Sequence, residues 1–185
     1  MNTDFTYNEA SAPAAIIFDT IFAEVSGGAL VANPDHDLRA GVAVGKHTDG
    51  KLYPIKGYRL VKAVASADTT IEIAKGSGVL VGDIIATGKK GVAVTAVDTT
   101  TYTTKDVVTV TLGVDVAIGK VLYQAATASA SAAAPIYTPF GILGDDCKAG
   151  EGDRRKKVVL GAIVRKETII ASDEVIALLP TIQKA

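Results

Sequence analysis

The chain has 185 residues, a formal net charge of −1, 48% hydrophobic residues and one cysteine. This length can bury roughly 70% of the unfolded surface, so no metal or disulfide staple is needed, and Cys147 alone cannot form an intrachain bridge. The balanced charge argues against nucleic-acid binding, and the absence of a basic n-region or a long apolar run argues against a secretory signal or a membrane span.

The N-terminal residues predict an arm followed by one regular element. Residues 1–12 are polar apart from Phe5 and Tyr7, and we interpret them as an arm that becomes ordered on a partner. The next stretch, AAIIFDTIFAEV (14–25), fits two structures. Ser11 as a cap and an early Pro13 favour a helix, whereas the β-branched content and short length favour a strand, which we prefer.

The stretch GVAVGKHTDGKLYPIK (41–56) predicts a β-hairpin. Asp49-Gly50 is a favoured two-residue loop of type I′, in which both central residues have positive φ. Counting outward from this loop gives five pairs: Thr48 with Lys51, Lys46 with Tyr53, Val44 with Ile55, His47 with Leu52, and Gly45 with Pro54. Pro54 has no N–H and indicates an edge strand, which the charges of Lys46, Lys51 and Lys56 would protect from aggregation.

The middle of the chain predicts a succession of short strands. Their expected ranges are 58–65, 70–74, 84–87, 91–97 and 107–112, with a hairpin turn at 87–91. Two segments, VLVGDII (79–85) and VAIGKVL (116–122), resemble each other. A duplicated function would explain them, but we prefer a recurrent turn that leads into a strand, because glycine beside a charged residue is ordinary turn chemistry.

The last third begins after a low-complexity stretch. The segment AATASASAAAP (125–135) predicts either a linker or a short helix stopped by its proline, and we place a boundary there. A charged loop at 144–156 and a strand at 157–166 follow. Ser172 is expected to cap a short helix, because Asp173 and Glu174 suit its first turn and Pro180 ends it.

Three groups of residues could carry chemistry, and each also has a structural interpretation. Asp35-His36-Asp37 could bind a metal or act as acid and base, but no second histidine lies at ligand spacing and Asn33-Pro34 precedes it, so we expect a solvated loop. Asp145, Asp146 and Cys147 could form a nucleophile site only with a histidine base, and we expect an acidic surface loop. The threonines of DTTTYTT (98–104) could bind ice or sugar, but a polar connection is the preferred interpretation.

These interpretations leave no expected catalytic residue, cofactor site or metal site. His47 is expected to be an exposed cross-strand residue. Phosphate-binding loops and a Gly-x-Ser-x-Gly elbow are absent. Aromatic residues make up only 5% of the chain, so exposed ring platforms for sugars should be few.

Two blocks of the sequence resemble bacteriophage head decoration proteins. The first is Gly41 to Val44 with Asp49-Gly50-Lys51-Leu52-Tyr53-Pro54. The second is Pro139-Phe140-Gly141-Ile142-Leu143, Asp146, a glycine-containing loop, the strand VVLGAIV (158–164) and the closing ALLPTI (177–182). The stretch between them, about 58–125, is similar to modules of phage head fibres and other virion surface proteins.

This resemblance implies a mainly β fold: a small β-barrel or sandwich core made of 13–56 and 135–185, a β-rich insert at 57–134, and a short C-terminal helix. It implies a non-enzymatic structural protein of the virion, made in the bacterial cytoplasm, that binds the major capsid protein on the outer capsid surface as a homotrimer. Phe5 and Tyr7 are the expected capsid contacts. A glycan- or host-binding module on a virion or surface fibre is the alternative.

Overall fold

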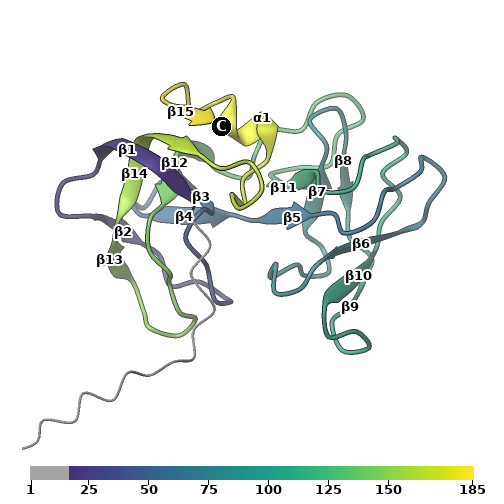
Figure 1. Cartoon of the computed structure of the whole chain (residues 1–185). Coiled ribbons are helices and arrows are strands. Elements are labelled where there is room, and N and C mark those ends of the chain that lie inside the picture. Colours follow the sequence, from purple (N-terminus) through teal and green to yellow (C-terminus); the bar gives the residue numbers. More distant parts are fainter. Residues whose placement is uncertain (1–16) are drawn as a thin grey trace, which may run out of the picture.

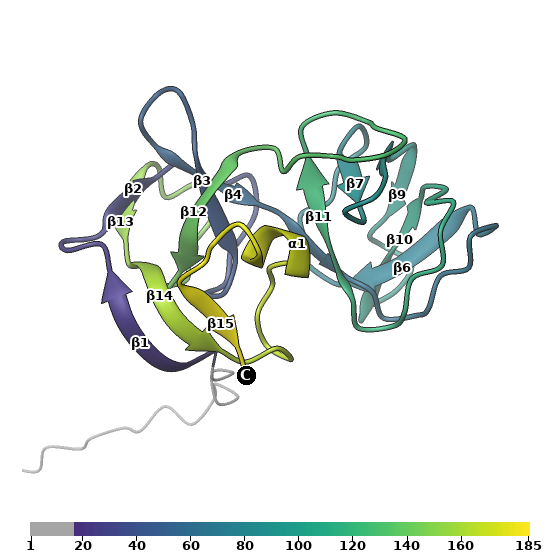
Figure 2. The ribbon, with the colours of Figure 1, turned by 90° about the horizontal axis from the view of Figure 1, so that it is seen from above.

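The computed structural model describes residues 17–185 and is mainly β, as expected, with a curled sheet, a β-rich insert and one short helix near the C-terminus. The expected arm, with Phe5 and Tyr7, lies outside the described residues. Two groups of strands lie side by side in Figures 1 and 2, joined by the continuous run of β4 into β5.

The first group forms one large curled sheet. Its strands are β1 (Phe18–Glu24), β2 (Ala29–Val31), β3 (Ala43–Lys46), β4 (Leu52–Ile55), β12 (Thr138–Leu143), β13 (Arg154–Lys156), β14 (Val158–Val164) and β15 (Ile182–Lys184). Their order is β1-β14-β12-β3-β4-β2-β13, with β15 parallel to β14. The sheet therefore combines strands from the first and the last part of the sequence, with β12 beside β3 and β13 beside β2.

The second group forms two smaller sheets. One has the order β6-β10-β9 and the other β5-β11-β7-β8. The bounds are β5 (Gly57–Arg59), β6 (Thr70–Ala74), β7 (Ile84–Ala86), β8 (Gly91–Ala93), β9 (Ala96–Asp98), β10 (Lys105–Thr109) and β11 (Val121–Ala125). A buried cluster that includes Tyr58, Ile73 and Leu122 fills the space between them.

The expected strands occur, but most have different bounds: β6 covers 70–74 as expected, whereas the strand expected at 107–112 begins earlier, at Lys105, and ends at Thr109. A strand covers Phe18–Glu24, and the hairpin at 87–91 has a two-residue loop in which Gly88 has positive φ, 83°. The expected strand at 91–97 is divided, because β8 pairs with β7 whereas β9 pairs with β10. The backbone of Val94 bonds to Asp83 and that of Thr95 to Thr109, so the chain changes sheets at this point.

The two similar segments are both turns that lead into strands. Asp83 N–H donates to the carbonyl of Leu80 before β7, and Lys120 N–H donates to that of Ala117 before β11. The glycine of each turn, Gly82 or Gly119, has positive φ. The recurrent-turn interpretation is therefore correct, and glycine is required because other residues are disfavoured there.

The hairpin at 41–56 exists, but its predicted register is wrong by one residue. The observed pairs are Ala43 with Ile55, Val44 with Pro54, Gly45 with Tyr53, and Lys46 with Leu52. Gly50 has a φ of 82°, and among residues 17–185 only glycines have positive φ, so Asp49 cannot occupy a type I′ loop. The loop has three residues, closed by hydrogen bonds between the backbones of His47 and Lys51 and of Gly50 and His47.

The expected edge is also wrong. Strand β4 lies between β3 and β2. Pro54, which has no N–H to donate, is tolerated there because β2 pairs with β4 at a single position, Leu52. Lys51 forms a surface ion pair with Asp153 at 2.6 Å. Lys56 is 7% exposed and lies at the passage from β4 to β5, so it is not an edge lysine.

The one short helix of the described chain, α1 (Asp173–Ile176), begins as expected. Ser172 is its N-cap, and the Ser172 side chain accepts a hydrogen bond from Val175 N–H at 3.1 Å. Val175 and Ile176 pack in a buried cluster that contains residues of both strand groups, including Ala43 and Tyr123. The segment 126–135 contains no helix, which leaves the linker interpretation.

Candidate interaction surface

Three aromatic rings meet at the end of the β3–β4 hairpin. The ring of His47 lies 4.9 Å from that of Tyr53 and 5.7 Å from that of Tyr137, and the two tyrosine rings are 5.2 Å apart. The His47 side chain is 42% exposed and both tyrosines are partly exposed. We call these three residues the aromatic cluster.

The three-residue loop creates this cluster. With Gly45 paired to Tyr53, the side chain of His47 lies diagonally opposite Tyr53 on the same face of the hairpin. Gly45 lets Tyr137 cross this face, because a Cβ at position 45 would lie 2.5 Å from the Tyr137 Cβ atom. The expected register placed His47 and Tyr53 on opposite faces and therefore missed the cluster.

Asp49 fixes the polar side of the aromatic cluster. Its carboxylate accepts hydrogen bonds from Lys51 N–H at 3.0 Å and from the Tyr53 hydroxyl at 2.9 Å, and lies 3.1 Å from Nδ1 of His47. The hydrogen bond from the Lys51 backbone is the main reason why the pKa of Asp49 is lowered. The hydrogen bond to the same carboxylate raises the pKa of Tyr53, so an anionic group lies beside the neutral Tyr53 ring.

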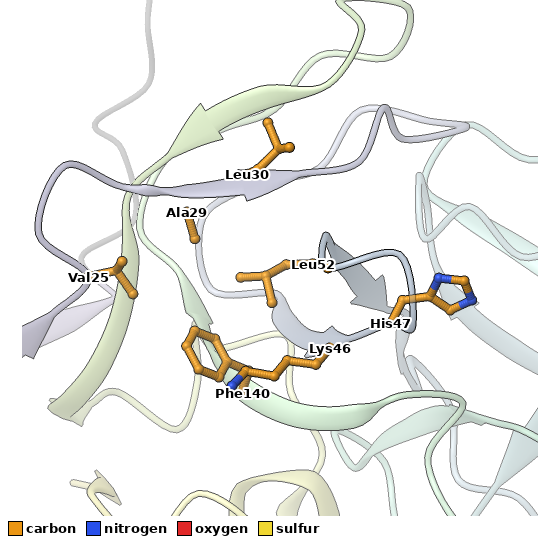
Figure 3. Close-up of a pocket in the computed structure, with 8 residues that line it drawn as sticks. Val25, Ala29, Leu30, Lys46, His47, Leu52 and Phe140 are labelled. Carbon is orange, nitrogen blue, oxygen red and sulfur yellow. The ribbon is translucent and has the colours of Figure 1, made fainter.

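An apolar groove opens on the other face of the hairpin (Figure 3). Its volume is about 180 Å³, and its lining consists of Val25, Ala29, Leu30, Lys46, His47, Gly50, Leu52 and Phe140. The Lys46 ammonium lies 4.4 Å from the centre of the Phe140 ring. Val25, Ala29 and Phe140 also pack against the buried cluster around Val44 and Leu52, so the groove opens onto a hydrophobic core.

The Asp35-His36-Asp37 segment is not only a solvated loop. Asp35 lies 2.5 Å from Nδ1 of His36 and 3.0 Å from the ammonium of the buried Lys56. Burial opposes ionisation of Asp35, but the hydrogen bonds from His36 and Lys56 outweigh it and lower the pKa. Asp37 is exposed and pairs with Lys148 at 2.9 Å. The segment thus contacts the lysine that lies between the two strand groups.

The Asp145-Asp146-Cys147 segment is used structurally. Asp145 accepts a hydrogen bond from Lys157 N–H at 3.0 Å, and Asp146 accepts one from Ala40 N–H at 2.8 Å. Cys147 is fully buried, and burial raises the pKa of its thiol. A nucleophile site would need a histidine beside these groups. Neither carboxylate is paired with His36 or His47, so this arrangement is not observed.

Other candidates have equally local partners. The Asp98 carboxylate accepts hydrogen bonds from the N–H groups of Thr100 and Thr101 at 3.0 Å, which forms a polar turn between β9 and β10. Among residues 17–185, no three His, Cys, Asp or Glu side chains are grouped to hold a metal ion. Within the same range, no helix is long and apolar enough to span a membrane.

A second cleft of about 380 Å³, with several charged side chains in its lining, lies between the two strand groups. Lys120, at its wall, pairs with Asp173 at 2.9 Å and with Glu174 at 3.1 Å. Arg59 donates hydrogen bonds to the carbonyls of Gly119 and Ile169. Through Asp173, Glu174 and the Ile169 carbonyl, these cations hold the insert against the C-terminal segment.

Comparison with known proteins identifies no relative: no family model, no curated protein and no solved structure matches the chain.

Proposed function

We propose that the chain is a structural protein of a bacteriophage virion, without catalytic activity, that binds the outer surface of the capsid as a homotrimer. In this role it stabilises the shell or projects from it as a head fibre. Its partner is the major capsid protein, and no cofactor, nucleic acid or membrane takes part.

One observation carries this proposal. The two sequence blocks that resemble decoration proteins are more than 80 residues apart in the chain, yet their strands are neighbours in the order β14-β12-β3-β4. The intervening residues form separate sheets beside this one (Figure 2). A curled sheet that carries a β-rich projection suits a protein that attaches by one part and extends by another.

The mechanism is mass action. A surface that exists only on the assembled shell binds the folded protein, and each contact stabilises the shell by the free energy of binding. Three copies of a weak contact on one trimer act together through their high effective concentration. In this mechanism Phe5 and Tyr7 are the proposed anchors, because aromatic side chains contribute strongly when they are buried on a partner.

Co-sedimentation with purified capsids of the phage that encodes the chain tests this function. The full chain should sediment with the shell, whereas replacement of both Phe5 and Tyr7 by alanine should weaken binding at least tenfold, given about 1–2 kcal/mol for each lost anchor. Unchanged binding would remove the two aromatic residues from the mechanism, and no binding by the full chain would refute the function. Light scattering should give the mass of three chains.

The aromatic cluster favours the second candidate, a glycan-binding module. Exposed rings beside a carboxylate offer apolar faces and a hydrogen-bond acceptor to a sugar. If glycans are ligands, Tyr53→Ala and Tyr137→Ala should each lower the glycan-array signal about tenfold. Tyr102→Ala should not, because Tyr102 is exposed on the insert, outside the aromatic cluster, where its ring contacts Lys105. Equal losses for all three variants, or no signal for the parent, would contradict this candidate.

A further inference from the structure

The groove is too small for a typical cofactor or metabolite. Small-molecule sites usually enclose about 300 Å³ or more, whereas this groove holds about 180 Å³. A volume of this size suits one large apolar side chain, the kind of anchor that fills a pocket in a protein interface. Figure 3 shows Ala29, Leu52 and Phe140 around the space that such an anchor would fill, with Leu30 on the other side of β2.

Lys46 places one positive charge at the rim of the groove. Lys46 is exposed and contacts the face of Phe140, and within residues 17–185 no carboxylate is paired with its ammonium. The ring of His47 points away from the groove, where it packs against Tyr53 and Tyr137. The best occupant is therefore an aromatic residue that has an acidic neighbour in its own sequence.

The N-terminal segment of this chain has that pattern. The sequence Asp4-Phe5-Thr6-Tyr7 places an acid directly beside an aromatic residue, and Asp4 and Glu9 are the only charged side chains among residues 1–16. An arm with this composition is complementary to the groove in both charge and hydrophobicity.

The segment is also long enough. Val25 lines the groove and lies about 26 Å along β1 from Ile17. The twelve residues from Phe5 to Ile17 can span up to about 40 Å. Phe5 can therefore reach the groove by a chain that turns back beside β1.

We propose that the groove of the free protein binds Phe5 of the chain's own N-terminal segment, with Asp4 paired to Lys46. This inference concerns the free protein in solution and does not require that the chain binds a capsid. On a shell, Phe5 would have to exchange the groove for the capsid, so the groove competes with the shell for the arm.

The absence of tryptophan from the chain gives a direct test. The full-length Phe5→Trp variant has a single indole, whose emission should be blue-shifted and whose quenching by acrylamide should be several-fold weaker than that of a free indole. Adding Ala29→Phe, which fills the groove, should expose the indole. Adding Ala93→Phe, at an exposed alanine of β8 in the insert, should change nothing.

A charge exchange tests the role of Lys46. In the Phe5→Trp background, Lys46→Glu should increase acrylamide quenching, and a further Asp4→Lys should restore protection. An exposed indole in the parent variant, or protection that persists after Ala29→Phe, would overturn the proposal and leave the groove to a different occupant. Failure of Asp4→Lys to restore protection would overturn the proposed ion pair.

Discussion

Replacement of Asp83 by alanine is expected to lower the free energy of unfolding by about 3–5 kcal/mol. The Asp83 side chain is 11% exposed and accepts hydrogen bonds from the Tyr58 hydroxyl, from Nε2 of Gln124 and from Leu80 N–H, each at 3.0 Å. The Lys56 ammonium lies 3.5 Å away. Alanine would leave Tyr58 and Gln124 buried without their acceptor and Lys56 with one carboxylate fewer, which is costly in a site shielded from water.

Asp37→Ala is the matched control. Asp37 also has a lysine partner and a backbone N–H partner, Lys148 and Ala149, but its side chain is 58% exposed. Its loss should change stability far less than the loss of Asp83, because water screens an exposed ion pair. Urea denaturation followed by circular dichroism measures both variants. Similar values for Asp83→Ala and Asp37→Ala would show that the buried network contributes little.

Gly57→Ala is expected to destabilise the fold by about 3 kcal/mol or more. Gly57 is the first residue of β5, and a Cβ atom there would lie 1.9 Å from the carbonyl oxygen of Ile170. The obstacle is backbone rather than a flexible side chain, so either β5 or the segment before α1 must move. Because β5 follows Lys56 directly, this movement would also disturb the contact between the two strand groups.

Gly76→Ala separates this clash from the effect of an added methyl group. Gly76 has a φ of 78° and nothing within 4 Å of its ideal Cβ position, so only backbone strain opposes alanine there, at about 1–2 kcal/mol. Thermal denaturation should place the midpoint of Gly57→Ala well below that of Gly76→Ala. The opposite order would show that residues near Ile170 yield easily.

Local sequence was sufficient where a few adjacent residues determine the structure. Ser172, Asp173 and Glu174 predict the start of α1 because an N-cap hydroxyl and acidic residues in the first turn act within one turn of backbone. The glycines of the two similar segments predict turns for the same reason, since positive φ is a property of the residue itself. The mainly β class follows from the many short runs of β-branched residues between such turns.

The hairpin marks the limit of local reasoning. Asp49-Gly50 identified the turn correctly, but a two-residue and a three-residue loop both place glycine in the left-handed region. Asp49 keeps negative φ while its carboxylate bonds to Lys51 N–H and to the Tyr53 hydroxyl. One additional residue in the loop changes which side chains of the two strands share a face, and it therefore places His47 on the same face as Tyr53. A count with a three-residue loop would have found this part of the aromatic cluster.

Sequence by itself determined the class of fold, the turns, the short helix and the presence of the hairpin, because backbone preference and alternation act over a few residues. Only the tertiary structure decided the burial of Lys56, the meeting of Tyr137 with the hairpin and the groove beside Phe140. Asp35 and Asp83 lie 21 residues before and 27 residues after Lys56 in the chain. Whether a lysine is a surface charge or a buried contact depends on which carboxylates, distant in sequence, the folded chain brings to it. No local sequence pattern specifies those partners.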